Sequence, residues 1–148
     1  MPDEPANNID RFNDLVAEIF ARLYGKFPIP EHIQVADLVD VNIDPTFQNT
    51  SQEEWNSVWF AEETLRWLKA SGYIWCGDIG NTVAESVVLS PKALELLKSV
   101  PRSLQPDETK SIGRALVEAT APDIRRKLVD IALTQGFRLF GSAIGMPM

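Results

Sequence analysis

Residues 51–74 read SQEEWNSVWFAEETLRWLKASGYI and contain the clearest structural signals of the chain. Ser51 and Glu54 fit a capping box, in which two side chains satisfy free backbone amides at the start of a helix. Gly72 is typical of the residue that follows a helix, so the pattern predicts a helix over residues 51–71. Its main apolar stripe, which should face the core, contains Val58, Ala61, Leu65 and Leu68.

Large aromatic residues extend the apolar surface of this helix beyond the main stripe. Phe60 and Trp67, seven residues apart, form a second stripe, and Trp55 and Trp59 lie on a third sector. An apolar surface this broad predicts contacts on more than one side of the helix. Trp55 and Trp59 either pack under another part of the chain or are exposed as anchors for a partner.

Beyond Gly72 the apolar residues no longer recur at helical spacing but at every second position. Residues 73–76 and 86–89 are strand candidates, and the turn-rich residues 77–82 join them into a hairpin. Ser90 followed by Pro91 then predicts the start of another helix, which ends near Pro101.

The flanking regions are predicted to be helical. A helix over residues 8–25 precedes a short second helix over residues 31–39, and residues 42–50 are a loop. Residues 101–108 are a linker. Two further helices are predicted over residues 109–119 and 122–135, and Gly136 either ends or bends the second of them. The fold class is therefore α+β and mainly helical.

Two segments carry a resemblance to a known superfamily. Residues 65–74 read LRWLKASGYI, and residues 87–97 read VVLSPKALELL. In the first segment, a helix ends in a run of leucine, glycine, tyrosine and isoleucine. In the second, a strand leads into a serine that caps the next helix. This combination resembles winged-helix (winged helix-turn-helix) domains over about residues 9–100. The resemblance implies a winged-helix-like domain over residues 1–100. Residues 101–148 would then be a helical extension that completes the core or forms a dimer. Such cores serve as DNA readers and as protein-interaction modules.

The charge distribution argues against DNA binding through the usual surface. The net charge is −7, and residues 1–100 hold 16 of the 21 acidic and 7 of the 14 basic residues. In winged-helix DNA readers, polar and basic residues occupy the first half of the helix before the wing. Here that half contains four glutamates, and the wing contains Asp78 and Glu85 but no base. Phosphate contacts by basic side chains normally dominate DNA affinity.

Composition excludes several other classes. No stretch approaches the roughly 18 apolar residues of a membrane span, and the start, MPDEPANN, lacks the basic and apolar parts of a secretory signal. Cys76 is the only cysteine, which fits a cytoplasmic protein. With His32 as the only histidine, a zinc cluster is not expected, and we expect no cofactor.

The sequence thus favours a non-enzymatic protein-interaction module that binds a protein partner or a second copy of the chain. The alternative is a DNA-binding transcriptional regulator, and a third hypothesis is a small enzyme that uses His32. For the C-terminal segment, folding back on the acidic core or self-pairing is favoured over lying on a membrane surface. The candidate binding residues are Trp55, Trp59, Glu62 and Arg66 on the long helix, and Arg125, Arg126, Lys127, Phe137 and Phe140 in the C-terminal segment.

Overall fold

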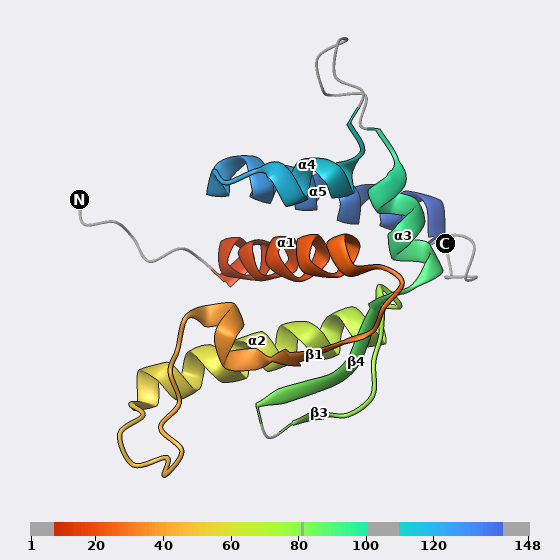
Figure 1. The fold of residues 1–148 in the computed structure, drawn as a ribbon. Helices are drawn as coiled ribbons and strands as arrows, with labels where there is room; N and C mark the ends of the chain where they lie inside the picture. The colour runs from red at the N-terminus through yellow and green to blue at the C-terminus, as the bar shows by residue number, and fades with distance from the viewer. Residues whose placement is uncertain (1–7, 81, 101–109, 141–148) are drawn as a thin grey trace, which may run out of the picture.

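Helix α1 (Asn8–Lys26) lies at the centre of the computed structural model, which describes residues 8–80, 82–100 and 110–140 (Figure 1). Three consecutive residues of this helix, Leu15, Val16 and Ala17, are buried. At 100° per residue, these three positions span about 200° of the helix circumference. Neighbouring elements therefore cover α1 on two sides.

One side of α1 is covered by helix α2 and a small antiparallel sheet (Figure 1). The strand order is β1-β4-β2, and β3 also pairs with β4. Ile33 of β1 lies opposite Ala84 of β4, and Ile74 of β2 lies opposite Leu89. The elements on this side are β1 (Glu31–Gln34), the 3₁₀ helix η1 (Val35–Val39), α2 (Gln52–Ala70), β2 (Ile74–Trp75), β3 (Ile79–Gly80) and β4 (Val83–Leu89).

The other side of α1 is covered by α4 (Ile112–Glu118) and α5 (Pro122–Phe140), and α3 (Pro91–Lys98) packs against both (Figure 1). Helices α4 and α5 add side chains to the same apolar core as the rest of the chain. Their buried members in this core are Ile112, Leu116, Leu128, Val129 and Ala132. The predicted linker, residues 101–108, lies outside the described residues.

The predicted helix over residues 31–39 is wrong. The chain forms strand β1 and then only the short 3₁₀ helix η1. Pro28 and Pro30 bias the residues before them toward extended conformations, and β1 gains backbone hydrogen bonds by pairing with β4. In β1, Ile33 is buried between the exposed His32 and Gln34. This alternation is typical of a strand with one buried face.

The predicted start of the long helix is confirmed. Ser51 Oγ accepts a hydrogen bond from the Glu54 N–H at 3.1 Å, and Glu54 Oε1 accepts one from the Ser51 N–H at 2.9 Å. The four residues of the main apolar stripe are all buried against the rest of the fold. The mainly helical α+β class is also confirmed. However, β4 begins three residues earlier than predicted, and α5 continues through Gly136 to Phe140.

The capping box gives a first testable prediction. Replacing Ser51 with Ala removes the acceptor for the Glu54 amide, and we expect the free energy of unfolding to fall by about 1 kcal/mol. Urea denaturation followed by circular dichroism measures the change. Asn56→Ala, an exposed position within the same helix, is the control and should change stability by less than about 0.5 kcal/mol. Equal stability of Ser51→Ala and the parent would contradict the prediction.

Candidate functional site

Helix α2 has a hollow on each flank. Its buried stripe fixes the helix to the sheet and to η1, so the residues beside that stripe face outward on two sides. One hollow lies between α2 and α1, and the other lies between α2 and the loop and strand turn next to it. We call the first the α1–α2 groove and the second the aromatic pocket.

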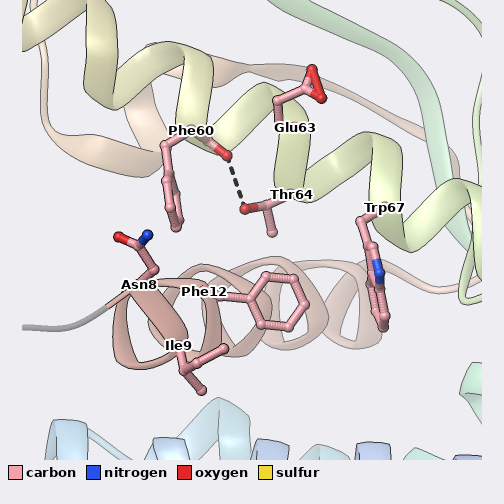
Figure 2. Close-up of a pocket in the computed structure, with 7 residues that line it drawn as sticks. All are labelled: Asn8, Ile9, Phe12, Phe60, Glu63, Thr64 and Trp67. Carbon is pink, nitrogen blue, oxygen red and sulfur yellow. Dashed lines mark hydrogen bonds between the residues drawn. The ribbon is translucent and has the colours of Figure 1, made fainter.

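The α1–α2 groove has a volume of about 380 Å³ and an almost wholly apolar lining. Figure 2 shows Phe60 and Trp67 extending from α2 toward α1, with Phe12 of α1 between them. The rings of Phe12 and Trp67 meet edge to face, with centroids 5.2 Å apart. The lining residues are Asn8, Ile9 and Phe12 from α1, and Phe60, Glu63, Thr64 and Trp67 from α2.

Large apolar side chains in this groove remain open to solvent. Ile9 is 67% exposed and Trp67 is 46% exposed, although Trp67 also stacks on Tyr73 with ring centroids 6.0 Å apart. Thr64, by contrast, is buried and donates its hydroxyl hydrogen bond to the Phe60 carbonyl at 2.9 Å. The groove is therefore an apolar surface in which the buried hydroxyl of Thr64 is already satisfied.

Charged groups flank the groove. The Arg11 guanidinium lies 4.3 Å from the centroid of the Phe60 ring, a cation–π contact. Glu63, at the α2 side, is exposed and pairs with Arg66 of the next turn at 2.6 Å. Polar groups at the edge of an apolar surface orient a ligand, and the apolar floor supplies the area that it buries.

The aromatic pocket is lined by Phe47, Trp55, Trp59, Glu62 and Thr82, and has a volume of about 400 Å³. Three of the residues proposed from sequence therefore meet in one hollow, and Phe47 from the preceding loop joins them. The Phe47 and Trp55 rings lie 5.8 Å apart. Trp59, one helical turn after Trp55, is 52% exposed, whereas Trp55 is partly buried.

The loop before α2 holds Phe47 against the pocket. Asp44 accepts hydrogen bonds from the Thr46 amide at 3.1 Å, the Thr46 hydroxyl at 2.7 Å and the Asn49 side chain at 2.9 Å. The bond from the Thr46 hydroxyl, together with the others, keeps the pKa of Asp44 below its ordinary value. The carboxylate therefore organises the loop at neutral pH, and this organisation is lost only as the pH falls through the lowered pKa.

Glu62 forms the polar wall of the aromatic pocket and is only 8% exposed. Its Oε2 accepts a hydrogen bond from the Thr82 N–H at 3.3 Å, and its Oε1 lies 3.7 Å from Arg66. Arg66 also pairs with Glu63 and donates to the Ile79 carbonyl at 3.1 Å. One guanidinium is thus shared between two carboxylates, which leaves a net negative charge beside the pocket.

The basic residues proposed in the C-terminal segment make contacts within the chain. Arg126 donates to both oxygens of Asp14, at 2.7 and 3.0 Å, and Arg125 donates to Glu18 at 3.1 Å. The pair with Asp14 raises the pKa of Arg126 above its ordinary value. Lys127 is exposed. The described part of the segment therefore folds back on the acidic side of α1.

The two exposed apolar residues described on α5 do not form one patch. Phe137 is exposed, as is Ile124 on the same helix. Thirteen residues at 100° each separate these two by about 140° around α5. The side chain of Phe140 lies outside the described residues.

Two further residues, His32 and Cys76, were considered for chemistry. His32 is exposed on β1, and its Nδ1 accepts a hydrogen bond from the Ser86 N–H at 3.2 Å. Burial raises the pKa of the partly buried Cys76 thiol. The thiol is therefore protonated at neutral pH, and a protonated thiol is a poor nucleophile.

Sequence reasoning found Trp55, Trp59 and Glu62 but missed the α1–α2 groove. Ile9 and Phe12 recur at helical spacing together with the buried residues of α1, so nothing in the sequence set them apart. The second stripe on α2, Phe60 and Trp67, was the signal that a further surface exists, because it lies away from the buried stripe. The sequence did not indicate that α1 packs beside this stripe.

Comparisons with known proteins leave the family open. No family model, no curated protein and no solved structure matches the chain at a significant level. In the described part of the chain, no helix combines the length and the apolar character needed to cross a membrane.

Proposed function

We propose that this protein is a non-enzymatic protein-interaction module whose α1–α2 groove binds an amphipathic helix of a partner protein. The observation that carries the proposal is the exposure of Ile9 and Trp67 in an apolar hollow between two helices. Contiguous exposed apolar surface rimmed by polar groups is typical of an interaction site.

The groove has the dimensions of a short helix contact. Its α2 side extends from Phe60 to Trp67, and seven residues at 1.5 Å each give a length of about 10 Å, or two helical turns. A helix that lies along this length presents its positions i, i+3 or i+4, and i+7 to the groove. The partner is therefore expected to place two or three aliphatic or aromatic side chains at this spacing.

The charges favour a basic polar face on the partner helix. Glu63 is exposed at the edge of the groove, and the whole chain carries a net charge of −7. Complementary charge accelerates the encounter of two proteins and suppresses wrong partners. A lysine or arginine next to the apolar anchors would share Glu63 with Arg66.

The winged-helix topology is part of the proposal. The element order α1, β1, η1, α2, β2, β3, β4, α3 and the strand order β1-β4-β2 support it. The alternative, a DNA-binding regulator, has less support. Arg66 is engaged with Glu62 and Glu63, and Arg125 and Arg126 are engaged with acidic side chains of α1. These pairs would have to break before the arginines contact phosphates.

A helical-peptide library displayed on phage tests the proposal. Selection against the parent protein should yield peptides with apolar anchors at the spacing given above and with net positive charge. Ile9→Lys puts a charge into the groove and should weaken the selected peptides at least about tenfold by fluorescence anisotropy. Ile29→Lys is the matched control, because Ile29 is similarly exposed in a loop away from the groove, and should leave the affinity unchanged.

Two results would overturn this function. One is a set of selected peptides whose affinity Ile9→Lys does not change, because such peptides bind elsewhere. The other is a dimer, detected by light scattering coupled to size-exclusion chromatography, that Ile9→Lys dissociates and Ile29→Lys does not. That dimer would assign the groove to a second copy of the chain.

A further inference from the structure

We infer that the aromatic pocket is a second binding site, and that its ligand is a quaternary ammonium group. The pocket is built from Phe47, Trp55, Trp59, Glu62 and Thr82, and it shares no lining residue with the α1–α2 groove. The inference therefore does not depend on what occupies the groove.

The walls of the pocket favour a cation. Trp55 and Trp59 are one turn apart on α2, so their side chains leave the helix on the same side, and the Phe47 ring packs at 5.8 Å from Trp55. The faces of aromatic rings are electrically negative and attract cations, most strongly for tryptophan. Three such rings line one hollow, so a single cation held there lies beside all three.

The polar wall of the pocket adds a carboxylate. Glu62 is only 8% exposed, and Arg66, with which it pairs, is closer to Glu63, at 2.6 Å, than to Glu62, at 3.7 Å. A partly desolvated carboxylate attracts a second cation more strongly than a carboxylate in open water does.

The shortage of hydrogen-bond acceptors decides the type of cation. A primary ammonium has three donors and a guanidinium has five. The rings offer no lone pairs, and the Glu62 carboxylate already accepts from the Thr82 amide and lies near Arg66. The remaining acceptors are Glu62 Oε1 and the Thr82 hydroxyl, so a protonated lysine or arginine would replace only part of its hydration. A trimethylammonium group has no donors, is weakly hydrated and contacts rings through its methyl groups.

Backbone strain at the pocket supports a built site. Phe47 and Thr82 have φ values of 59° and 65°, in the left-handed region that favours glycine. For a β-branched residue such as Thr82 this conformation is a genuine outlier. Strained residues of this kind persist where surrounding structure holds them, and they cluster at ligand sites. The Asp44 carbonyl accepts a hydrogen bond from the Phe47 N–H at 2.7 Å, and the Glu62 carboxylate accepts one from the Thr82 N–H at 3.3 Å.

A titration with choline tests the inference. Two-dimensional NMR should show saturable shifts of the Trp55 and Trp59 indole N–H signals over millimolar choline. The neutral carbon analogue 3,3-dimethylbutan-1-ol has the same shape without the charge, and should bind about tenfold more weakly. Equal affinity for the two compounds would overturn the inference, because it would show an apolar pocket only. An absence of saturable shifts would overturn it as well.

Variants locate the binding. Trp59→Ala should abolish the shifts of the Trp55 indole, and Trp59→Phe should restore part of the affinity. Glu62→Gln keeps an acceptor for the Thr82 amide, removes the charge, and should weaken choline binding about tenfold. Trp75→Ala is the control, because Trp75 is an exposed tryptophan on β2 outside the pocket, and it should bind choline as the parent does. Choline binding that survives both Trp59→Ala and Glu62→Gln would contradict this assignment.

Two sources of the quaternary ammonium group are distinguished by the same measurement. A short peptide with trimethyllysine, compared with its unmethylated form, represents a modified protein, and phosphocholine represents a headgroup or free metabolite. Tighter binding of the trimethylated peptide than of phosphocholine assigns the site to a modified protein. Tighter binding of phosphocholine assigns it to the second source. Either result upholds the ligand chemistry.

Discussion

A chain that ends at Val100 is expected to lose the cooperative unfolding of the full-length protein. This truncation keeps the whole region of winged-helix resemblance but removes α4 and α5. It exposes one side of α1, which is buried over about 200° of its circumference. It also removes the ion pairs that Arg125 and Arg126 make with α1.

The size of the loss follows from the side chains involved. Ile112, Leu116, Leu128 and Val129 are buried in the common core. Burying each is worth about 1.5–3 kcal/mol, so the four contribute roughly 6–12 kcal/mol before the cost of ordering their helices. A domain of this size has a total stability of about 5–15 kcal/mol. The truncated chain is therefore left at or below the threshold of folding.

Circular dichroism measures the outcome. The truncated chain should keep part of its far-ultraviolet helical signal, lose its near-ultraviolet aromatic signal, and melt without a sigmoidal transition. A cooperative transition within a few degrees of the full-length protein would show that residues 1–100 are an independent domain. Leu116→Ala in the full chain is a milder companion and should cost about 2–5 kcal/mol.

Gly136→Ala is expected to destabilise the protein, although alanine is the better helix former. At an unhindered helical position, this substitution is worth about 1 kcal/mol in favour of alanine. At Gly136, however, a Cβ would lie 2.6 Å from the Tyr73 hydroxyl and 2.9 Å from Leu96 Cδ1. Both neighbours belong to the buried core. Relieving such an overlap typically costs about 1–3 kcal/mol, so we expect a net loss of stability.

The matched control is Gly25→Ala. Gly25 lies in the last turn of α1, and nothing lies within 4 Å of the Cβ that alanine would add there. Urea denaturation should therefore show opposite signs for the two substitutions, with Gly25→Ala neutral or stabilising by up to about 1 kcal/mol. If both substitutions stabilise the protein, the close approach of α5 to Tyr73 is not what requires glycine at position 136.

Local signals in the sequence were sufficient to predict the elements whose first and last residues are marked by neighbouring residues. The Ser51 capping box and the stripe of α2 are examples, because both depend on residues within four positions of one another. The strand over residues 31–34 was not predictable in the same way. Its backbone hydrogen bonds are made with β4, some fifty residues later, and its single buried residue, Ile33, fits a helix as well as a strand.

The candidate site likewise contains residues that local spacing predicts and residues that it does not. Trp55, Trp59 and Glu62 were predicted to act together because helical spacing alone brings them to one side of α2. Phe47 and Thr82 were not, because a hydrogen-bonded loop and a left-handed residue in the turn before β4 bring them there. The groove depends on how α1 packs beside α2, which is a property of the whole fold. Gly136 shows the same limit, because its neighbour Tyr73 is distant in sequence.

Because two hollows share one helix, insertions and deletions within α2 are expected to be restricted. Trp59 and Glu62 line the aromatic pocket, and the next residue in each case, Phe60 and Glu63, lines the groove. An insertion or deletion of a single codon within α2 would turn every later residue by about 100°, and would move the later members of both sites off their faces at once. Length variation among natural homologues should therefore fall in the loop before Ser51 or in the turn after Gly72, and the spacing from Trp55 to Trp67 should stay constant.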